Sequence, residues 1–127
     1  MPRATQLTIN LKSKTGVLAQ LARTLADARV NIVSLSAESA AGRGKIRVIV
    51  NDAVKAKRAL RRGKYRFSEE PAFVVRLRNK PGSLARVAGK LAKARVNIKS
   101  AYATTAGRGA AVVITVGSVA KARKVLR

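Results

Sequence analysis

The sequence contains no cysteine and no histidine, and these absences remove much of the side-chain chemistry on which enzymes rely. Without cysteine, the chain has neither a disulfide framework nor a thiolate metal site. Without histidine, it lacks the commonest general base and the commonest zinc ligand. We therefore expect a protein that is not an enzyme, with no catalytic residue, no metal and no cofactor.

Long hydrophobic runs are missing as well. The longest apolar stretch, Ala110–Val116, is far shorter than the roughly 20 residues of a membrane-spanning helix. The amino-terminal residues run straight into a short alternating segment and do not resemble a signal peptide. The sequence therefore predicts no membrane association and a cytoplasmic location.

Acidic side chains are scarce. The chain has 28 Lys and Arg residues against 5 Asp and Glu residues, which gives a formal net charge of +23 and a pI near 12.0. Such a balance favours an acidic partner, either a nucleic acid or an acidic protein. A basic surface that only contacts solvent is the alternative, and composition alone leaves both open.

What the sequence does contain is an internal repeat. Gly16 recurs as Gly82 and Asn31 recurs as Asn97, so both anchors are separated by 66 residues. The residues around these anchors are also nearly the same in the two copies. A repeat of this kind defines the folding unit. We expect two small domains, at residues 1–68 and 69–127.

Hydrophobic periodicity predicts the same order of elements in both copies. In the first copy, we expect strands near 7–11, 30–37, 46–50 and 65–67, and helices near 17–28 and 53–62. In the second copy, we expect strands near 73–77, 96–103 and 112–116, and helices near 83–94 and 119–126. Asp52 and Ser118 are suited to cap the later helix of each copy. Ser68–Pro71 is expected to be a minimal linker.

This order predicts an α+β fold made of two ferredoxin-like βαββαβ repeats. Each repeat should have an antiparallel sheet with its helices on one face, and the second repeat should lack its last strand. Ala72–Arg78 should then present an open sheet edge, unless Tyr65–Phe67 or another chain fills it. We therefore expect a homo-oligomer or an edge that is repaired within the chain.

Two motifs resemble the ACT domain family. Asn79-Lys80-Pro81-Gly82-Ser83-Leu84 resembles the first turn of that family, and Val96-Asn97-Ile98 resembles the opening of its second strand. Val30-Asn31-Ile32 repeats the second motif in the first copy. The first copy departs from the pattern at the turn, where Ser13 and Thr15 replace the usual acid or amide and the proline.

The resemblance implies a regulatory protein that binds a small molecule, most often an amino acid, between paired domains. In such pairs, the first turn of one domain faces the opening of the second strand of the other. The positions that correspond to this site in the first copy are Ser13, Thr15, Gly16, Val17, Asn31 and Ile32. The positions in the second copy are Asn79, Pro81, Gly82, Ser83, Leu84, Asn97 and Ile98.

The residue types suit this chemistry. Gly16 and Gly82 stand between a strand and a helix, where free backbone N–H groups and the helix dipole attract a carboxylate. Asn31 and Asn97 offer a donor and an acceptor, so each suits a carboxylate or an ammonium group. The simpler alternative is that the asparagines cap the preceding helices and the glycines only make the turns.

Nucleic-acid binding is the alternative function, because RNA-recognition modules share the βαββαβ order. Those modules stack bases on aromatic residues of the sheet. This chain has two Tyr, two Phe and no Trp, and the expected third strands contain no aromatic residue. Base stacking is therefore disfavoured, while sequence-independent contacts to a nucleic-acid backbone stay open.

Overall fold

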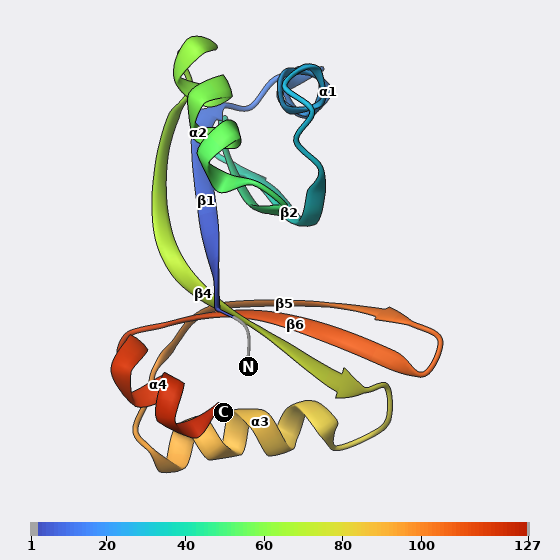
Figure 1. The fold of residues 1–127 in the computed structure, drawn as a ribbon, viewed down its shortest axis with the longest axis vertical. Coiled ribbons are helices and arrows are strands. Elements are labelled where there is room, and N and C mark those ends of the chain that lie inside the picture. Colours follow the sequence, from blue (N-terminus) through green and yellow to red (C-terminus); the bar gives the residue numbers. More distant parts are fainter. Residues whose placement is uncertain (1–2, 127) are drawn as a thin grey trace. The chain divides into compact units, whose positions relative to one another are not determined.

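A computed structural model describes residues 3–126 of the chain (Figure 1). The strands are β1 (Arg3–Lys12), β2 (Ile32–Ala40), β3 (Arg43–Val50), β4 (Arg66–Arg78), β5 (Ile98–Ala106) and β6 (Gly109–Val116). The helices are α1 (Val17–Asp27), α2 (Ala53–Arg62), α3 (Ser83–Lys93) and α4 (Val119–Val125).

The chain divides into two compact units. Thr5–Glu70 form one, which we call the first repeat, and Pro71–Arg127 together with Met1–Ala4 form the other, the second repeat. The strand β4 belongs to both, because its residues up to Glu70 lie in the first repeat and the rest in the second. The expected linker at Ser68–Pro71 contains the boundary between the units, but it is part of a strand. The residue before a proline favours extended backbone, so this segment continues the strand instead of turning.

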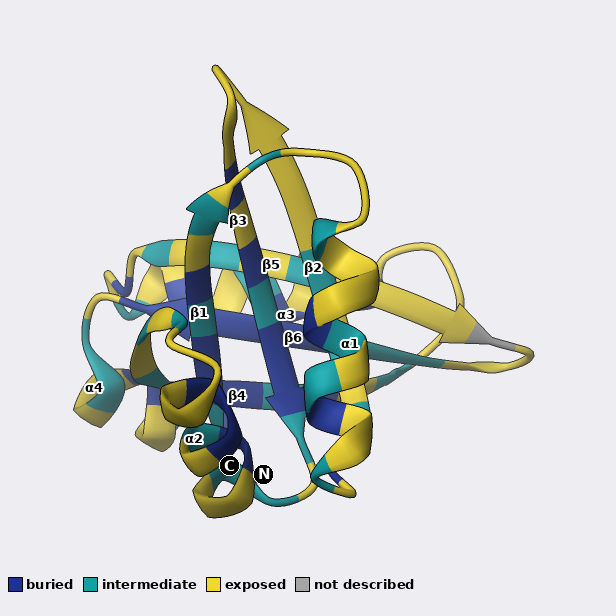
Figure 2. Ribbon diagram, turned by 90° about the horizontal axis from the view of Figure 1, so that it is seen from above, coloured by how far each residue is buried: buried dark blue, intermediate teal, exposed yellow. Residues whose placement is uncertain are grey.

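The first repeat has a sheet in the order β2-β3-β1, followed by the amino-terminal part of β4. The strands β1 and β3 are antiparallel, with Leu7 opposite Val48 and Ile9 opposite Ile46. These four side chains are buried on one face, where α1 and α2 pack through buried apolar residues. Figure 2 shows buried residues along the strands and exposed residues on the outer faces of the helices.

The second repeat repeats this arrangement with the carboxy-terminal part of β4, followed by β6 and β5. Phe73 lies opposite Ile114, and both are buried in a core that includes Leu91 of α3 and Ala122 of α4. Figure 1 shows α3 and α4 on the same side of these strands. The two ferredoxin-like repeats with antiparallel strands and helices on one face are thus confirmed.

The edge of the second repeat is closed only in part. No strand follows α4 within the described chain. The neighbour of β4 opposite β6 is β1, and from β1 the second repeat includes Arg3 and Ala4 among the described residues. The expected repair within the chain is therefore found, but it covers a short part of β4. Tyr65 and Phe67 do not supply it, since they pack against the core of the first repeat.

The helices α1 and α3 end in the same unusual way. Arg29 and Arg95 adopt left-handed backbone angles, with φ of 60° and 58°. The next N–H groups, from Val30 and Val96, donate to the carbonyls five residues earlier at 2.9 Å. This is the Schellman ending, in which glycine is the usual left-handed residue. It turns the chain directly into β2 and β5.

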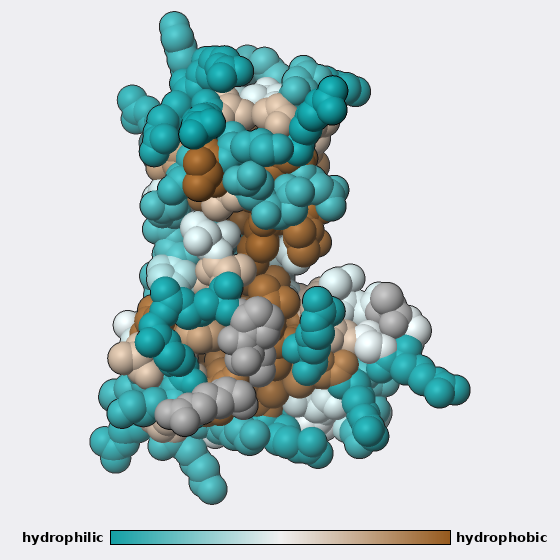
Figure 3. All heavy atoms as spheres, viewed as in Figure 1, coloured by the Kyte–Doolittle hydropathy of each residue, from teal (hydrophilic) through white to brown (hydrophobic). Residues whose placement is uncertain are grey.

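The surface agrees with the composition. The face drawn in Figure 3 is covered mainly by hydrophilic side chains. None of the helices in the described part of the chain is long and apolar enough to span a membrane.

The two leucines at opposite ends of α1 test this packing. Leu25 is fully buried, whereas Leu18 is 43% exposed. Leu25→Ala should lower the free energy of unfolding by about 2–5 kcal/mol, because it removes buried contacts and leaves a cavity. Leu18→Ala, the same change on the same helix, should stay within about 0.5 kcal/mol. Urea denaturation of both variants measures the difference, and equal losses would contradict the assignment of the core.

Candidate functional site

The turns that precede α1 and α3 have the same backbone geometry. Gly16 and Gly82 have φ of 88° and 89°, which is a left-handed conformation that strains any L side chain. A Cβ built at either position would meet no atom within 4 Å. The backbone conformation therefore requires glycine at both turns, and the space outside each turn is open.

The amino termini of α1 and α3 lack side-chain caps. The carboxylate of Asp52 accepts a hydrogen bond from the Lys55 N–H (3.1 Å) at the start of α2, and the Ser118 hydroxyl accepts one from the Lys121 N–H (3.4 Å) at the start of α4. Both predicted caps are confirmed. No side chain caps α1 or α3, and neither helix has an acidic residue in its first turn. Their amino-terminal dipoles are thus not neutralised, which suits an anion.

Ser13 and Asn79 connect these turns to the nearby hairpins. The Ser13 N–H donates to the Gly42 carbonyl at 2.9 Å, and the Ser39 hydroxyl donates to that of Ser13. In the second repeat, the Asn79 N–H donates to the Arg108 carbonyl at 2.7 Å. The Asn79 side-chain amide donates to the carbonyl of the preceding residue, Gly107, at 3.1 Å. These two predicted site residues therefore hold the turns in place.

In the first repeat, the turn opens onto a small pocket of about 220 Å³. The end of β1, the turn, the start of α1 and the hairpin of β2 and β3 form its lining. The lining residues are Leu11, Ser13, Lys14, Val17, Leu18, Ala37, Glu38, Ser39, Gly44 and Ile46. Of the predicted site residues, the structure thus brings Ser13 and Val17 together here. Thr15 and Gly16 lie on the exposed outer side of the same turn.

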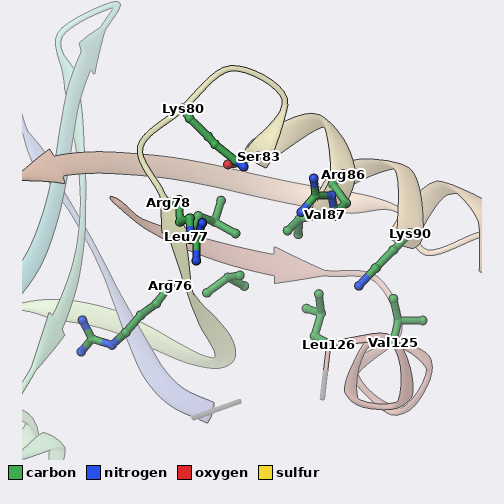
Figure 4. A pocket seen from close by; sticks show the side chains of 11 residues that line it. Arg76, Leu77, Arg78, Lys80, Ser83, Arg86, Val87, Lys90, Val125 and Leu126 are labelled. Atoms are coloured by element: carbon green, nitrogen blue, oxygen red, sulfur yellow. The ribbon is translucent and has the colours of Figure 1, made fainter. Parts of the chain in front are cut away.

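In the second repeat, the predicted turn residues face two directions. Pro81, Gly82 and Leu84 are exposed, and Leu84 at 51% corresponds to the exposed Leu18 of the first repeat. Ser83 is buried and lines a groove of about 360 Å³ (Figure 4). This groove, which we call the β4 groove, runs between β4, α3 and the end of the described chain.

The two asparagines lie far from the turns of their own repeats. Asn31 and Asn97 follow α1 and α3, whereas the glycine turns precede these helices. Each helix has 11 residues, so its two ends are about 16 Å apart at a rise of 1.5 Å per residue. One small ligand therefore cannot contact both the turn and the asparagine of a single repeat.

Both asparagine side chains are exposed. Their backbones are fixed by the following segment, since the Asn51 and Gly117 N–H groups donate to the carbonyls of Asn31 and Asn97 at 3.1 and 2.9 Å. The side-chain amides of Asn31 and Asn97 have no hydrogen-bond partner within residues 3–126. They do not cap the preceding helices, whose C-cap residues are Ala28 and Ala94. Ile32 and Ile98, next to them, are half-buried.

None of the four aromatic residues is exposed. Phe73 is buried, and Tyr65 and Phe67 pack against the core of the first repeat. Tyr102 is half-buried on β5. Within the described residues, no group of three His, Cys, Asp or Glu side chains is placed to hold a metal ion.

Sequence reasoning missed the β4 groove and the cations along it. The signal was available in the comparison of the two repeats. Arg76, Arg86 and Lys90 of the second repeat take the places of Asn10, Gln20 and Thr24 in the first.

Two glycines of the second repeat test whether the turn requires its left-handed backbone. Gly82→Ala should lower the free energy of unfolding by about 1–2 kcal/mol, because the new side chain is strained at this φ. Gly89 lies within α3, and a Cβ there also meets nothing within 4 Å. Gly89→Ala should therefore raise stability by roughly 0.5–1 kcal/mol. Changes of the same sign in thermal or urea unfolding would contradict the turn geometry.

Comparisons with known proteins agree with this fold. The family model of the ACT domain matches residues 5–62 and 72–127. Protein BT0572 from Bacteroides thetaiotaomicron has a similar structure, with 32% identity, a TM-score of 0.92, and coverage of 98% of this chain and 86% of the other. No curated protein matches the sequence.

Regulatory subunits of aspartate kinase share the fold at lower identity. The subunit from Thermus thermophilus, in a ligand-free form, has 18% identity, a TM-score of 0.71, and coverage of 98% of this chain and 88% of the other. The subunit from Thermus flavus has 16% identity, a TM-score of 0.68, and coverage of 98% and 90%.

The double match explains why the anchors recur at constant spacing and why both turns have the same geometry. It supports a regulatory role that depends on binding a small molecule. The chain carries two consecutive copies of one domain and belongs to the ACT domain family.

Proposed function

We propose that this protein is a non-catalytic regulatory protein that binds an α-amino acid or a related small carboxylate. The ligand binds between the glycine turn of one repeat and the asparagine of another repeat, in the same chain or in a second copy within a homo-oligomer. The residues proposed to contact or shape the two kinds of half-site are Ser13, Thr15, Gly16, Val17, Asn31 and Ile32, and Asn79, Pro81, Gly82, Ser83, Leu84, Asn97 and Ile98.

The observation that carries this proposal is the difference between the helix amino termini. The helices α2 and α4 are capped by their own side chains, whereas α1 and α3 begin at left-handed glycines without a cap. The Val17 and Ser83 N–H groups already donate to the Lys14 and Lys80 carbonyls at 3.2 and 3.3 Å. A carboxylate bound at these turns would satisfy the N–H groups that follow them in the first turn of each helix. The exposed Leu18 and Leu84 beside the turns offer contact for an apolar ligand side chain.

The asparagines supply the complementary half. An α-amino acid has an ammonium group that needs an acceptor, and a side-chain amide provides both an acceptor and donors. Asn31 and Asn97 are exposed and held by their backbones at the start of β2 and β5. Because the turn and the asparagine of one repeat are separated by a whole helix, ligand binding couples two repeats. Such coupling provides a route from ligand binding to regulation.

The regulated protein is proposed to be a separate polypeptide. Structures that share the fold include regulatory subunits of aspartate kinase, which supports action of this kind. The identity is too low to carry over the ligand or the enzyme. The ligand class rests on the turn chemistry.

Substitution of an asparagine tests the proposed site. Thermal shift and calorimetry with each standard amino acid should identify a ligand that stabilises the wild-type protein. Asn97→Ala should then weaken its binding by about two- to tenfold, because one or two hydrogen bonds are lost. Asn10→Ala, an exposed asparagine on β1 outside the proposed site, should leave the affinity unchanged.

Three results would contradict the proposal. The first is the absence of any stabilising amino acid or small carboxylate. The second is unchanged affinity of Asn97→Ala together with Asn31→Ala. The third is an equal loss in Asn10→Ala, which would show that the effect does not come from this site.

A further inference from the structure

The charge of the protein is distributed unequally between the repeats. All 5 acidic residues lie in the first repeat, and the sequence from Pro71 onward contains none. In the first repeat, Asp27, Glu38 and Glu69 form ion pairs with Arg23, Arg47 and Lys57 at 3.8, 3.3 and 3.0 Å. The cations of the second repeat have no acidic side chain in their own sequence segment. The positive charge of the second repeat is therefore not balanced within its own sequence segment, which favours an acidic partner.

The β4 groove runs along a sheet edge. Four consecutive residues of β4, Val75–Arg78, line it. Consecutive side chains of a strand point to opposite faces of the sheet, so a groove that all four line must follow the edge of the strand. The other edge of β4 pairs with β6 over Phe73–Arg78. Edge N–H and C=O groups of this kind accept an added strand.

The first repeat shows what occupies the same position when the edge is covered. There, β1 pairs with β3 on one side and neighbours β4 on the other. From β4, Phe67 packs against the core, and the Glu69 carboxylate lies 3.0 Å from the Lys57 ammonium group of α2. The covering strand thus combines an apolar side chain toward the helices with a carboxylate at a basic helix.

The second repeat carries more cations at the open edge than the first repeat carries at the covered one. Arg86 and Lys90 of α3 replace neutral Gln20 and Thr24. In Figure 4, both side chains extend from α3 into the groove, whose floor is apolar. The apolar residues that line it are Val75, Leu77, Val87, Val125 and Leu126. The groove is thus suited to a strand with both apolar and acidic side chains.

We propose that the β4 groove binds an extended acidic segment of another protein, which adds as a strand along Val75–Arg78. Its backbone pairs with the edge of β4, and its side chains on the face toward α3 include apolar ones that cover the floor and carboxylates that pair with Arg86 and Lys90. A second copy of this chain is a poor occupant, because it has the same strong positive charge and its acidic side chains at residues 27, 38 and 69 are already paired. A nucleic acid cannot pair with a strand edge, and its charged backbone would not cover the apolar floor.

A labelled model peptide tests this surface by fluorescence anisotropy. The probe is a short peptide in which phenylalanine and glutamate take every second position in turn, with threonine between them. Both kinds of side chain then share one face of the strand, as Phe67 and Glu69 do in the first repeat. Arg86→Gln with Lys90→Gln should weaken its binding by about tenfold or more, because charge-assisted hydrogen bonds are lost. Arg58→Gln with Arg62→Gln removes two exposed cations at the same helical spacing from α2 and should change the affinity by less than about twofold.

Two further measurements separate strand addition from simple charge attraction. The same peptide with alternate backbone amides methylated keeps every charge but cannot pair with the edge, so it should bind at least about tenfold more weakly. Hydrogen exchange should show that the unmodified peptide protects backbone amides within Val75–Arg78. Amino-acid binding at the turns is not required for either result, so the two proposals fail independently.

Several outcomes would overturn the proposal. Equal losses in the two double variants, or equal binding of the methylated peptide, would mean that charge alone attracts the probe. Equal competition by a single-stranded oligonucleotide of matched charge would indicate a general polyanion surface. Protection of Val75–Arg78 without peptide, rising with protein concentration, would assign the edge to a second copy of this chain.

Discussion

The strand β4 is a single covalent element that has a different place in each repeat. Its first residues close the sheet of the first repeat beside β1, and its later residues open the sheet of the second repeat beside β6. Backbone groups that pair in one repeat are not available to the other. Within residues 3–126, the first repeat therefore has a complete set of four strands, whereas the second repeat receives only the short start of β1 at the corresponding edge. The β4 groove follows from this arrangement.

The length of the first helix in each repeat imposes a second constraint, which acts on ligand binding. In each repeat, the glycine turn is at one end of the first helix and the asparagine is at the other. Residues of both types repeat at the same spacing, and the local geometry is the same in the two copies, down to the left-handed Arg29 and Arg95. Because a rigid helix of 11 residues separates the two groups, a small ligand that uses both must join two repeats. The proposed regulation depends on that separation.

Charge distinguishes the two repeats more than their fold does. The first repeat has acidic residues and uses several of them in local ion pairs, whereas all charged residues of the second repeat are basic. Exposed ion pairs contribute little to stability, so the fold does not require this difference. The difference in charge affects which partners each repeat attracts. It is consistent with different functions for two domains of the same family.

The sequence by itself determined most of the architecture. The constant spacing of Gly16 and Gly82 revealed the repeat, the alternation around Leu7 and Phe73 placed the strands, and Asp52 and Ser118 marked the capped helices. These signals are local, since each depends on residues that are close in the chain. Only the tertiary structure decided that Ser68–Pro71 continue a strand, that Arg3 and Ala4 join the second repeat, and that Arg86 and Lys90 line a groove. These features depend on strand pairing between residues that are distant in the sequence. Hydrophobic periodicity and motif spacing do not specify which sheet edge a strand will pair with.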